Sequence, residues 1–207
     1  MSRPGGRTAR TAAAVFAATL DELSERSYDE VSIDTIAARS GVHKATLYRR
    51  WHSKPELITH ALAGSGRSLF PVPDTGSADT DFRELARSVQ EALSNPRGAA
   101  ITRALLAGSS ASPEIRLVMQ QYWAARLAVI SVIIDRAIAR GELPAGTDPK
   151  ATMRAAHAPL YYKLLVTFEP ITRQDADQSA AAALAAARAK VFAQPPQGAA
   201  DQAADGP

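Results

Sequence analysis

The stretch "SIDTIAARSGVHKATLYRRWHSKPEL", residues 32–57, decides the fold of this chain. Its apolar side chains recur at helical spacing before and after Gly41, and the second run ends near Trp51. Ser32 is a favourable N-cap, Asp34 is well placed in the first turn, and Gly41 can take the left-handed conformation that ends a helix. We therefore expect two short helices joined by a tight turn, which is the pattern of a helix-turn-helix.

The second short helix carries most of the basic and aromatic side chains of this stretch. Four apolar residues would lock the two helices together: Ile36, Ala37, Val42 and Leu47. An α-helix fits the major groove of DNA, where its side chains reach base edges and neighbouring donors bind phosphates. The side chains left for DNA are His43, Lys44, Thr46, Tyr48, Arg49 and Arg50. Taken alone, a pair such as Arg49 and Arg50 is more often a solvated helix face than a nucleic-acid contact.

The rest of the chain is also expected to be helical, because alanine and leucine dominate and apolar residues recur at helical spacing. A segment rich in Gly, Pro, Ser and Asp at 64–81 separates an N-terminal module from a larger one. We expect about nine helices, and seven of them have boundaries near 7–24, 33–40, 43–51, 81–93, 97–107, 113–140 and 173–192. The fourth begins at 54 and has Gly64 and Gly66 in its last turns, and the eighth begins at 149. Pro159 is expected to kink the eighth of them. The expected class is all-α, with an N-terminal three-helix bundle and a C-terminal helical bundle.

Composition narrows the possible functions. The chain has 207 residues, 46% of them hydrophobic, no cysteine, and a formal net charge of +3. Disulfides and cysteine-based sites are therefore excluded, and a cytoplasmic location is expected. The apolar run "LAVISVII" at 127–134 is much shorter than the roughly 20 residues that span a bilayer. We expect no association with a membrane.

Catalysis finds little support in the sequence. The four histidines form no pair at i and i+4 spacing, and neither a glycine-rich phosphate loop nor a nucleophile elbow is present. We therefore expect a protein that is not an enzyme and that has no catalytic residues, metal site or cofactor.

Residues 32–57 also resemble the signature of the TetR (tetracycline repressor) family of transcriptional regulators, and the resemblance extends over about residues 7–63. It implies that Lys44, Ala45 and Thr46 face the major groove, with Ala45 small enough for close approach. His43 stands where the family often has Ser or Thr, so it would read a base or touch a phosphate. The resemblance implies phosphate contacts for Ser32, Tyr48 and Lys54, and a structural role in the core for Trp51.

The same resemblance implies a division of labour along the chain. Residues 7–53 would form the DNA-binding domain, and residues 54–193 an effector-binding and dimerisation domain. Independently of the resemblance, the composition of residues 194–207 predicts a disordered tail. A small-molecule effector would bind in the C-terminal bundle, and the residues expected to line its pocket are Met119, Tyr122, Trp123, Arg126 and His157. The expected function is that of a repressor released from a palindromic operator in double-stranded DNA by this effector. The alternative is a helix-turn-helix protein controlled by a protein partner, or one with no small-molecule effector.

A single recognition helix covers only a few base pairs, so specific binding calls for a homodimer. The last two helices could supply its interface. A stripe of small and apolar residues would allow close packing there: Ala180, Ala183, Leu184, Ala187 and Val191, faced by Leu160, Leu164 and Leu165. The alternative is that this stripe packs within its own subunit.

Overall fold

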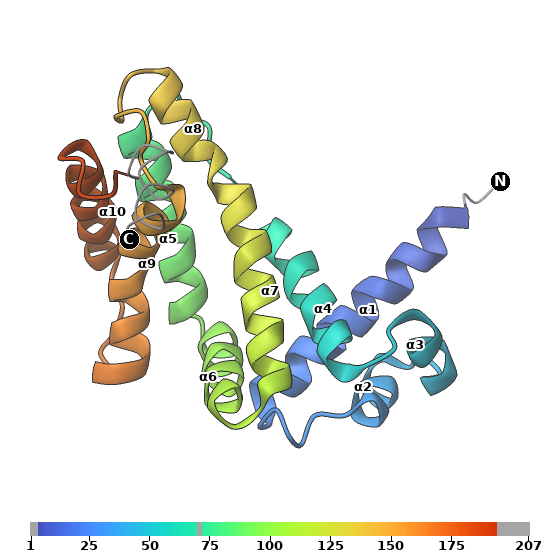
Figure 1. Cartoon of the computed structure of the whole chain (residues 1–207). Coiled ribbons are helices and arrows are strands. Elements are labelled where there is room, and N and C mark those ends of the chain that lie inside the picture. Colours follow the sequence, from blue (N-terminus) through green and yellow to red (C-terminus); the bar gives the residue numbers. More distant parts are fainter. Residues whose placement is uncertain (1–3, 70–71, 194–207) are drawn as a thin grey trace, which may run out of the picture. The chain divides into compact units, whose positions relative to one another are not determined.

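The computed structural model describes residues 4–69 and 72–193, and the regular structure of this part of the chain is helical (Figure 1). It comprises α1 (Pro4–Glu25), α2 (Ile33–Ser40), α3 (Lys44–Arg50), α4 (Lys54–Leu69), α5 (Ala78–Ser94), α6 (Pro96–Ala111), α7 (Pro113–Ile130), α8 (Val132–Ala139), α9 (Pro149–Tyr162), the π-helical segment η1 (Lys163–Thr167) and α10 (Arg173–Arg188). The expected all-α class is confirmed. The helix expected over 113–140 is interrupted at Ser131 and is numbered as α7 and α8, so the described residues carry the labels α1 to α10 where about nine helices are expected. The tail at 194–207 lies outside the described residues.

Capping hydrogen bonds fix the ends of the two short helices α2 and α3. The Ser32 hydroxyl accepts a bond from the Thr35 N–H at 3.1 Å, and the Thr35 hydroxyl accepts one from the Ser32 N–H at 3.1 Å. Helix α2 ends at Gly41, whose φ of 68° lies in the left-handed region that favours glycine. Helix α3 ends where the Trp51 N–H donates to the Leu47 carbonyl at 2.7 Å. The predicted helix-turn-helix is confirmed, with its N-cap and its turn at the expected residues.

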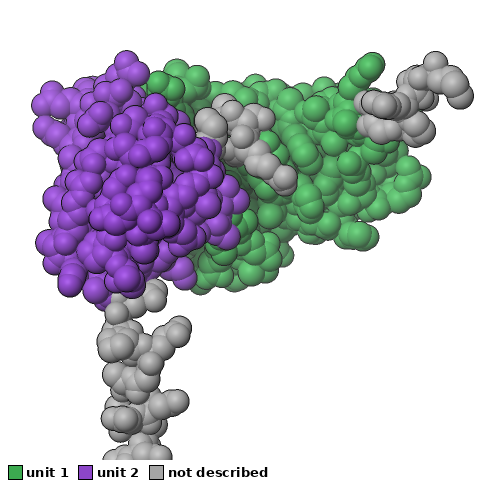
Figure 2. Space-filling model, turned by 90° about the horizontal axis from the view of Figure 1, so that it is seen from above, with its two compact units in different colours: residues 1–71, 91–126 green, residues 72–90, 127–207 purple. Residues whose placement is uncertain are grey.

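Close packing divides the chain into two compact units, which Figure 2 colours separately. Unit 1 comprises residues 1–71 and 91–126, and unit 2 comprises residues 72–90 and 127–207. Unit 1 therefore contains α6 and most of α7 in addition to the helix-turn-helix. Its border differs from the expected functional border after residue 53, because α1 packs against α4 and α6 as well as against α2.

One hydrophobic core holds unit 1 together. Leu47 of α3 is fully buried in it, as are Ile36 of α2, Leu57 of α4 and Ile115 of α7. The predicted lock between α2 and α3 is confirmed, since its two remaining members pack against the same core. Full burial of one leucine stabilises a fold by about 1.5–3 kcal/mol. Helix α3 therefore keeps its position chiefly through Leu47 and through the neighbouring Trp51, which is 3% exposed.

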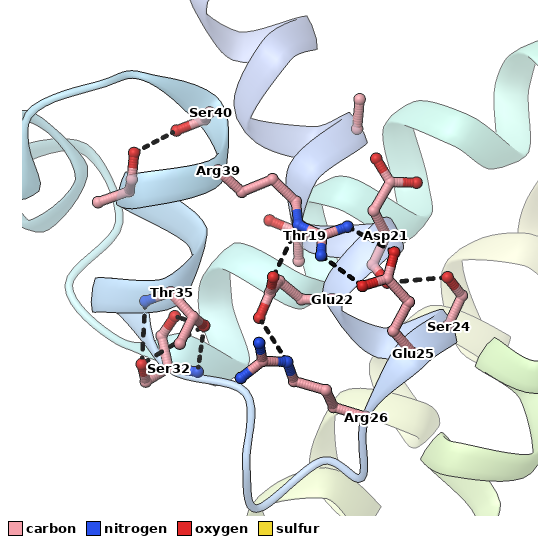
Figure 3. A network of polar contacts seen from close by, with 12 residues as sticks. Thr19, Asp21, Glu22, Ser24, Glu25, Arg26, Ser32, Thr35, Arg39 and Ser40 are labelled. Carbon is pink, nitrogen blue, oxygen red and sulfur yellow. Dashed lines mark hydrogen bonds and ion pairs between the residues drawn. The ribbon is translucent and has the colours of Figure 1, made fainter.

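A charged network joins α1 to α2 within unit 1 (Figure 3). Arg39 of α2 lies between two glutamates of α1: its Nε is 2.7 Å from Glu22 Oε1, and its Nη1 donates to Glu25 Oε1 at 2.7 Å. The Glu22 side chain is only 3% exposed, and Arg26 approaches its other oxygen at 3.5 Å. A carboxylate so deeply buried needs cationic partners. Arg39 therefore neutralises Glu22 and fixes the orientation of α2 against α1.

Replacing Arg39 with methionine is expected to lower the free energy of unfolding by about 2–3 kcal/mol, because Glu22 then keeps only the more distant Arg26. If the loss comes from the stranded carboxylate, adding Glu22→Gln to Arg39→Met should recover part of it. Urea unfolding of both single variants and of the double variant measures this coupling. A double variant less stable than Arg39→Met alone would contradict the explanation.

The last two α-helices, α9 and α10, pack against each other inside unit 2. Ala180, Ala183, Leu184 and Ala187 of α10 are all buried, and α10 lies against α9, which buries Leu160. The expectation that these four residues of α10 form a dimer surface is therefore wrong, and the alternative holds. Small side chains let two helices of the same subunit approach closely, which gives the same sequence pattern as a docking face. Val191, the last residue of the expected stripe, is 67% exposed.

Helices α7 and α8 follow one another in a 27-residue apolar stretch, Pro113–Ala139. By length and composition alone, this stretch is long and apolar enough to cross a membrane, because an 18-residue window within it has a mean hydropathy of 1.5. Core helices of soluble proteins meet the same criterion, so the finding is weak evidence for a membrane span. Its residues Ile115, Ile130 and Ile133 are buried in the protein, as expected for helices of a bundle.

Candidate nucleic-acid interface

Helix α3 buries one side chain and presents most of the others to solvent. Leu47 is fully buried and Thr46 is half-buried. Figure 1 shows α2 and α3 as neighbouring short helices, as the shared core requires. The residues exposed at the N-cap and along α3 are His43, Lys44, Ala45, Tyr48, Arg49 and Arg50. Six of the nine residues predicted to bind DNA are therefore accessible on one short segment.

The first turns of α2 and α3 lie close together. Lys44, the first residue of α3, has its Nζ 2.5 Å from Oδ1 of Asp34 in the first turn of α2. The hydrogen bond that the Lys44 ammonium donates to the Asp34 carboxylate raises the pKa of Lys44. The same ammonium lies 5.7 Å from the centre of the Tyr48 ring. Ser32, two residues before Asp34 at the N-cap of α2, is half-buried.

Arg50 and Lys54 donate to backbone carbonyls of unit 1. The Arg50 Nη1 donates to the Thr8 carbonyl at 3.3 Å, and its guanidinium lies 5.0 Å from the centre of the Trp51 ring. The Lys54 Nζ donates to the Tyr28 carbonyl at 3.0 Å and lies 3.8 Å from the centre of the Tyr28 ring. Both cations are therefore held in place before any polyanion is present.

Partial burial changes the titration of Lys54 and of Tyr28 beneath it. Burial lowers the pKa of Lys54, against the effect of the nearby carboxylates Asp29 and Glu114. Burial, together with Glu114 and Asp29, raises the pKa of Tyr28 to about 12. A phosphate contact by Lys54, which the family resemblance implies, would require the ammonium to leave the ring and the carbonyl. Of the nine predicted DNA-binding residues, Lys54 is thus the one whose side chain is most engaged within the protein.

The five residues expected to line an effector pocket fall in both compact units. Met119, Tyr122, Trp123 and Arg126 lie on α7 in unit 1, and His157 lies on α9 in unit 2. Met119 packs against the core of unit 1, and the rings of Tyr122 and Trp123 meet edge to face at 5.4 Å. Burial raises the pKa of Tyr122, and the charge of Arg126 opposes that effect. His157 is buried.

Each unit also has an open cleft. In unit 1, a cleft of about 670 Å³ lies between the start of α4 and α7, and its lining includes Lys54, Glu114 and Leu117. In unit 2, a cleft of about 660 Å³ lies between the end of α9 and α10, and its lining includes Tyr162 and Lys163. Neither of these two clefts is lined by the five residues expected to bind an effector.

The sequence did not predict the groups that accept hydrogen bonds from Lys44, Arg50 and Lys54. Asp34 is assigned there only to the helix dipole, and Tyr28 and Thr8 receive no role. An acidic residue in the first turn of α2 is the one signal that the sequence offers, because the tight turn at Gly41 brings that position near the first turn of α3. The carbonyl contacts of Lys54 and Arg50 depend on tertiary packing and leave no such signal.

Comparison with known proteins identifies both halves of the chain. Residues 15–61 match the family model described as "Bacterial regulatory proteins, tetR family", and residues 72–183 match "Tetracyclin repressor-like, C-terminal domain". The chain is 33% identical to the HTH-type transcriptional regulator AqdR of Rhodococcus erythropolis over 70% of this chain and 69% of AqdR. It is 31% identical to the DNA-binding transcriptional repressor TetR of Mycobacteroides abscessus over 73% of this chain and 80% of the relative. The crystal structure of the TetR family transcription regulator SCO0332 has a similar fold, with a TM-score of 0.70 at 22% identity over 84% of this chain and 97% of that one.

Proposed function

This chain belongs to the TetR family of bacterial transcriptional regulators, and we propose that it is a repressor that binds a palindromic operator as a homodimer and leaves it when a small-molecule effector binds. It is accordingly a DNA-binding regulator with a helix-turn-helix. The repressor role is supported by the name of the relative from Mycobacteroides abscessus. The proposal locates the protein in the cytoplasm, where bacterial DNA lies, and assigns it no catalytic step.

The observation that carries the proposal is the one-sided burial of α3. Its apolar residue Leu47 faces the core, while its cations and the small Ala45 face solvent. In the proposed complex, His43, Lys44, Ala45 and Thr46 face base edges. Ser32, Tyr48, Arg49, Arg50 and Lys54 bind phosphates, and Lys54 exchanges the Tyr28 carbonyl for a phosphate oxygen.

Selection of bound duplexes from a random pool tests this function. The expected result is an inverted repeat whose half-sites lie about one helical turn apart, 34–36 Å, or at a related longer spacing. Affinity for the selected duplex should exceed affinity for a scrambled duplex of the same composition, and should fall steeply with salt. A pool from which no sequence is enriched at low salt would contradict the proposal.

An exposed apolar surface that runs from the end of α9 to the residue after η1 is the proposed dimer contact. Tyr162, Val166 and Phe168 are 56%, 57% and 73% exposed. Phe168 has φ 55°, a left-handed conformation that costs a residue with a side chain roughly 1–2 kcal/mol. A phenylalanine that is strained and 73% exposed gains little packing energy within its own subunit. We propose that it packs against the second subunit, in continuity with the cleft between α9 and α10.

Phe168→Gly separates dimerisation from folding, because glycine adopts φ 55° without strain. We expect monomer stability to stay the same or rise by about 1 kcal/mol, while the dimer dissociation constant rises about tenfold or more. Sedimentation over a concentration series measures the dissociation constant, and thermal unfolding measures stability. Lys190→Gly is the matched control, since Lys190 also has positive φ, 61°, and is exposed. Equal dissociation constants for the two variants would contradict the assignment.

The proposed effector contacts in unit 1 are Met119, Tyr122, Trp123 and Arg126 of α7. His157 of α9 is a separate candidate contact within unit 2. An effector can release DNA only if it binds the DNA-free conformation more tightly than the DNA-bound one. Helix α4 follows the helix-turn-helix directly and buries Leu57, Ile58 and Ala61 in the core of unit 1, so it is the proposed link. Its movement would change the separation of the two α3 helices in the dimer.

Fluorescence and DNA release together test the effector proposal. The chain has two tryptophans, so Trp51→Phe leaves Trp123 as the reporter. A panel of apolar and aromatic compounds is added to this variant on its selected duplex. We expect at least one compound to change Trp123 emission and release the duplex over the same concentration range. Compounds that change emission without affecting DNA would contradict the coupling, and would favour control by a protein partner.

A further inference from the structure

The surface formed by the first turns of α2 and α3 contains a carboxylate that is not among the proposed DNA-binding groups. Asp34 lies in the first turn of α2, its side chain is 62% exposed, and its Oδ1 is 2.5 Å from the Nζ of Lys44. Phosphates repel a carboxylate, so Asp34 opposes DNA binding unless it performs another task. We propose that Asp34 is a specificity determinant, which withholds Lys44 from phosphates and leaves it able to bind acceptor atoms on a base edge. This inference rests on the proposed DNA-binding function.

The geometry of the ammonium group supports two contacts at once. A lysine ammonium has three N–H donors, and Asp34 takes one of them. The remaining donors can reach O6 and N7 of a guanine, a common partner for lysine in the major groove. The pKa of Lys44, which Asp34 raises, keeps this group charged. Asp34 can therefore stay bound while Lys44 reads a base.

A phosphate at the same position is attracted only weakly. The pair of Lys44 and Asp34 has no net charge, so it attracts a phosphate much less than a lone lysine does. A phosphate oxygen close enough to bind Lys44 also lies near the carboxylate. The neighbouring cations differ, because Arg50 and Lys54 donate to the neutral carbonyls of Thr8 and Tyr28. The bonded acceptors therefore add no negative charge beside these two cations, although Asp29 and Glu114 lie near Lys54.

Asp34 should therefore weaken binding to arbitrary DNA more than binding to the operator. Binding to arbitrary DNA depends almost entirely on neutralised phosphates, whereas operator binding adds base contacts. Removing the carboxylate frees Lys44 for one additional phosphate. The ratio of operator affinity to affinity for arbitrary DNA then falls, even though both affinities rise.

Asp34→Asn tests this with two labelled duplexes, the one that the wild-type protein selects from a random pool and a scrambled duplex of the same composition. We expect the dissociation constant for the scrambled duplex to fall about tenfold, and that for the selected duplex to fall less than about threefold. Between about 50 and 200 mM salt, the slope of log K against log salt for the scrambled duplex should steepen by about 1. Anisotropy titrations measure all of these values.

Two controls separate the local pair from a general effect of charge. Asp135→Asn makes the same change in charge at an exposed position of α8, and should leave the affinity ratio unchanged. In a Lys44→Gln background, Asp34→Asn should change the scrambled-duplex constant less than threefold, because no ammonium is released. Thermal unfolding of each variant checks that α2 keeps its cap.

The possible outcomes are distinct. A lower ratio in Asp34→Asn, lost in the Lys44→Gln background, supports the inference. An unchanged ratio, or the same change in both backgrounds, overturns it while the DNA-binding function stands. A wild-type protein that distinguishes no duplex from its scrambled form overturns the proposed function itself, and this inference with it.

Discussion

Ala45→Glu is expected to reduce affinity for the selected duplex about 100-fold or more without changing thermal stability. Ala45 lies in the first turn of α3, and its methyl group is exposed to solvent. A glutamate there would add a carboxylate to the surface that approaches DNA, where like charges cost several kcal/mol. The longer side chain would also prevent close approach of the helix to the floor of the groove. Titration of a labelled duplex measures the loss.

Ala124→Glu is the matched control for this prediction. Ala124 is an exposed alanine of α7 in the same compact unit, so the variant has the same change in charge and size. We expect its affinity for the selected duplex to lie within about twofold of the wild-type value. A change of one unit in net charge by itself alters affinity little at physiological salt. Similar losses in both variants would mean that α3 is not the groove-facing element.

Trp51→Ala is expected to destabilise the protein by about 3–5 kcal/mol, the usual range for a large aromatic removed from a core. Trp51 follows α3 directly and is 3% exposed. Its ring lies 5.5 Å from the ring of Phe16 on α1, and the Arg50 guanidinium covers it at 5.0 Å. The substitution leaves a cavity at the junction of α1 and α3. Urea unfolding measures the change in the free energy of unfolding.

The same variant should lose DNA binding in urea concentrations at which the wild type still binds, because α3 loses one of its two main attachments to the core. Trp51→Phe is the conservative control, since a phenyl ring can keep the contact with Phe16. It should retain most of the stability and of the affinity. If Trp51→Ala unfolds with the wild-type midpoint, the assignment of Trp51 to the core is wrong.

The helix-turn-helix was predictable from the sequence because the residues that specify it lie close together along the chain. Ser32 caps the helix that follows it, Gly41 supplies the left-handed turn, and Leu47 is the apolar residue of a short polar helix. Each of these features depends on neighbours within a few residues. The division of the long helix at Ser131 was not predicted, because Ser131 itself keeps helical φ and ψ and its sequence has no breaker.

The surfaces of unit 2 were harder to predict, for a physical reason. Ala180 and Ala183 allow close helix packing, but their pattern does not say whether the partner helix belongs to the same chain or to another. Phe168 offers little signal, since its exposure depends on the left-handed turn that follows η1. The pair of Asp34 and Lys44 joins residues from two helices, and becomes visible only when the turn between them is built.

The single core of unit 1 limits how new regulators can be made from this one. Ile115 and Val118 of α7 pack in the same core as Leu47 and Trp51. Residues 7–53 therefore cannot be replaced on their own by the corresponding segment of a relative. The side chains of α7 in the core would then face a segment with which they do not pack well. New operator preference is better engineered by changing only the solvent-facing positions of α3. Natural divergence of binding specificity in this scaffold faces the same constraint.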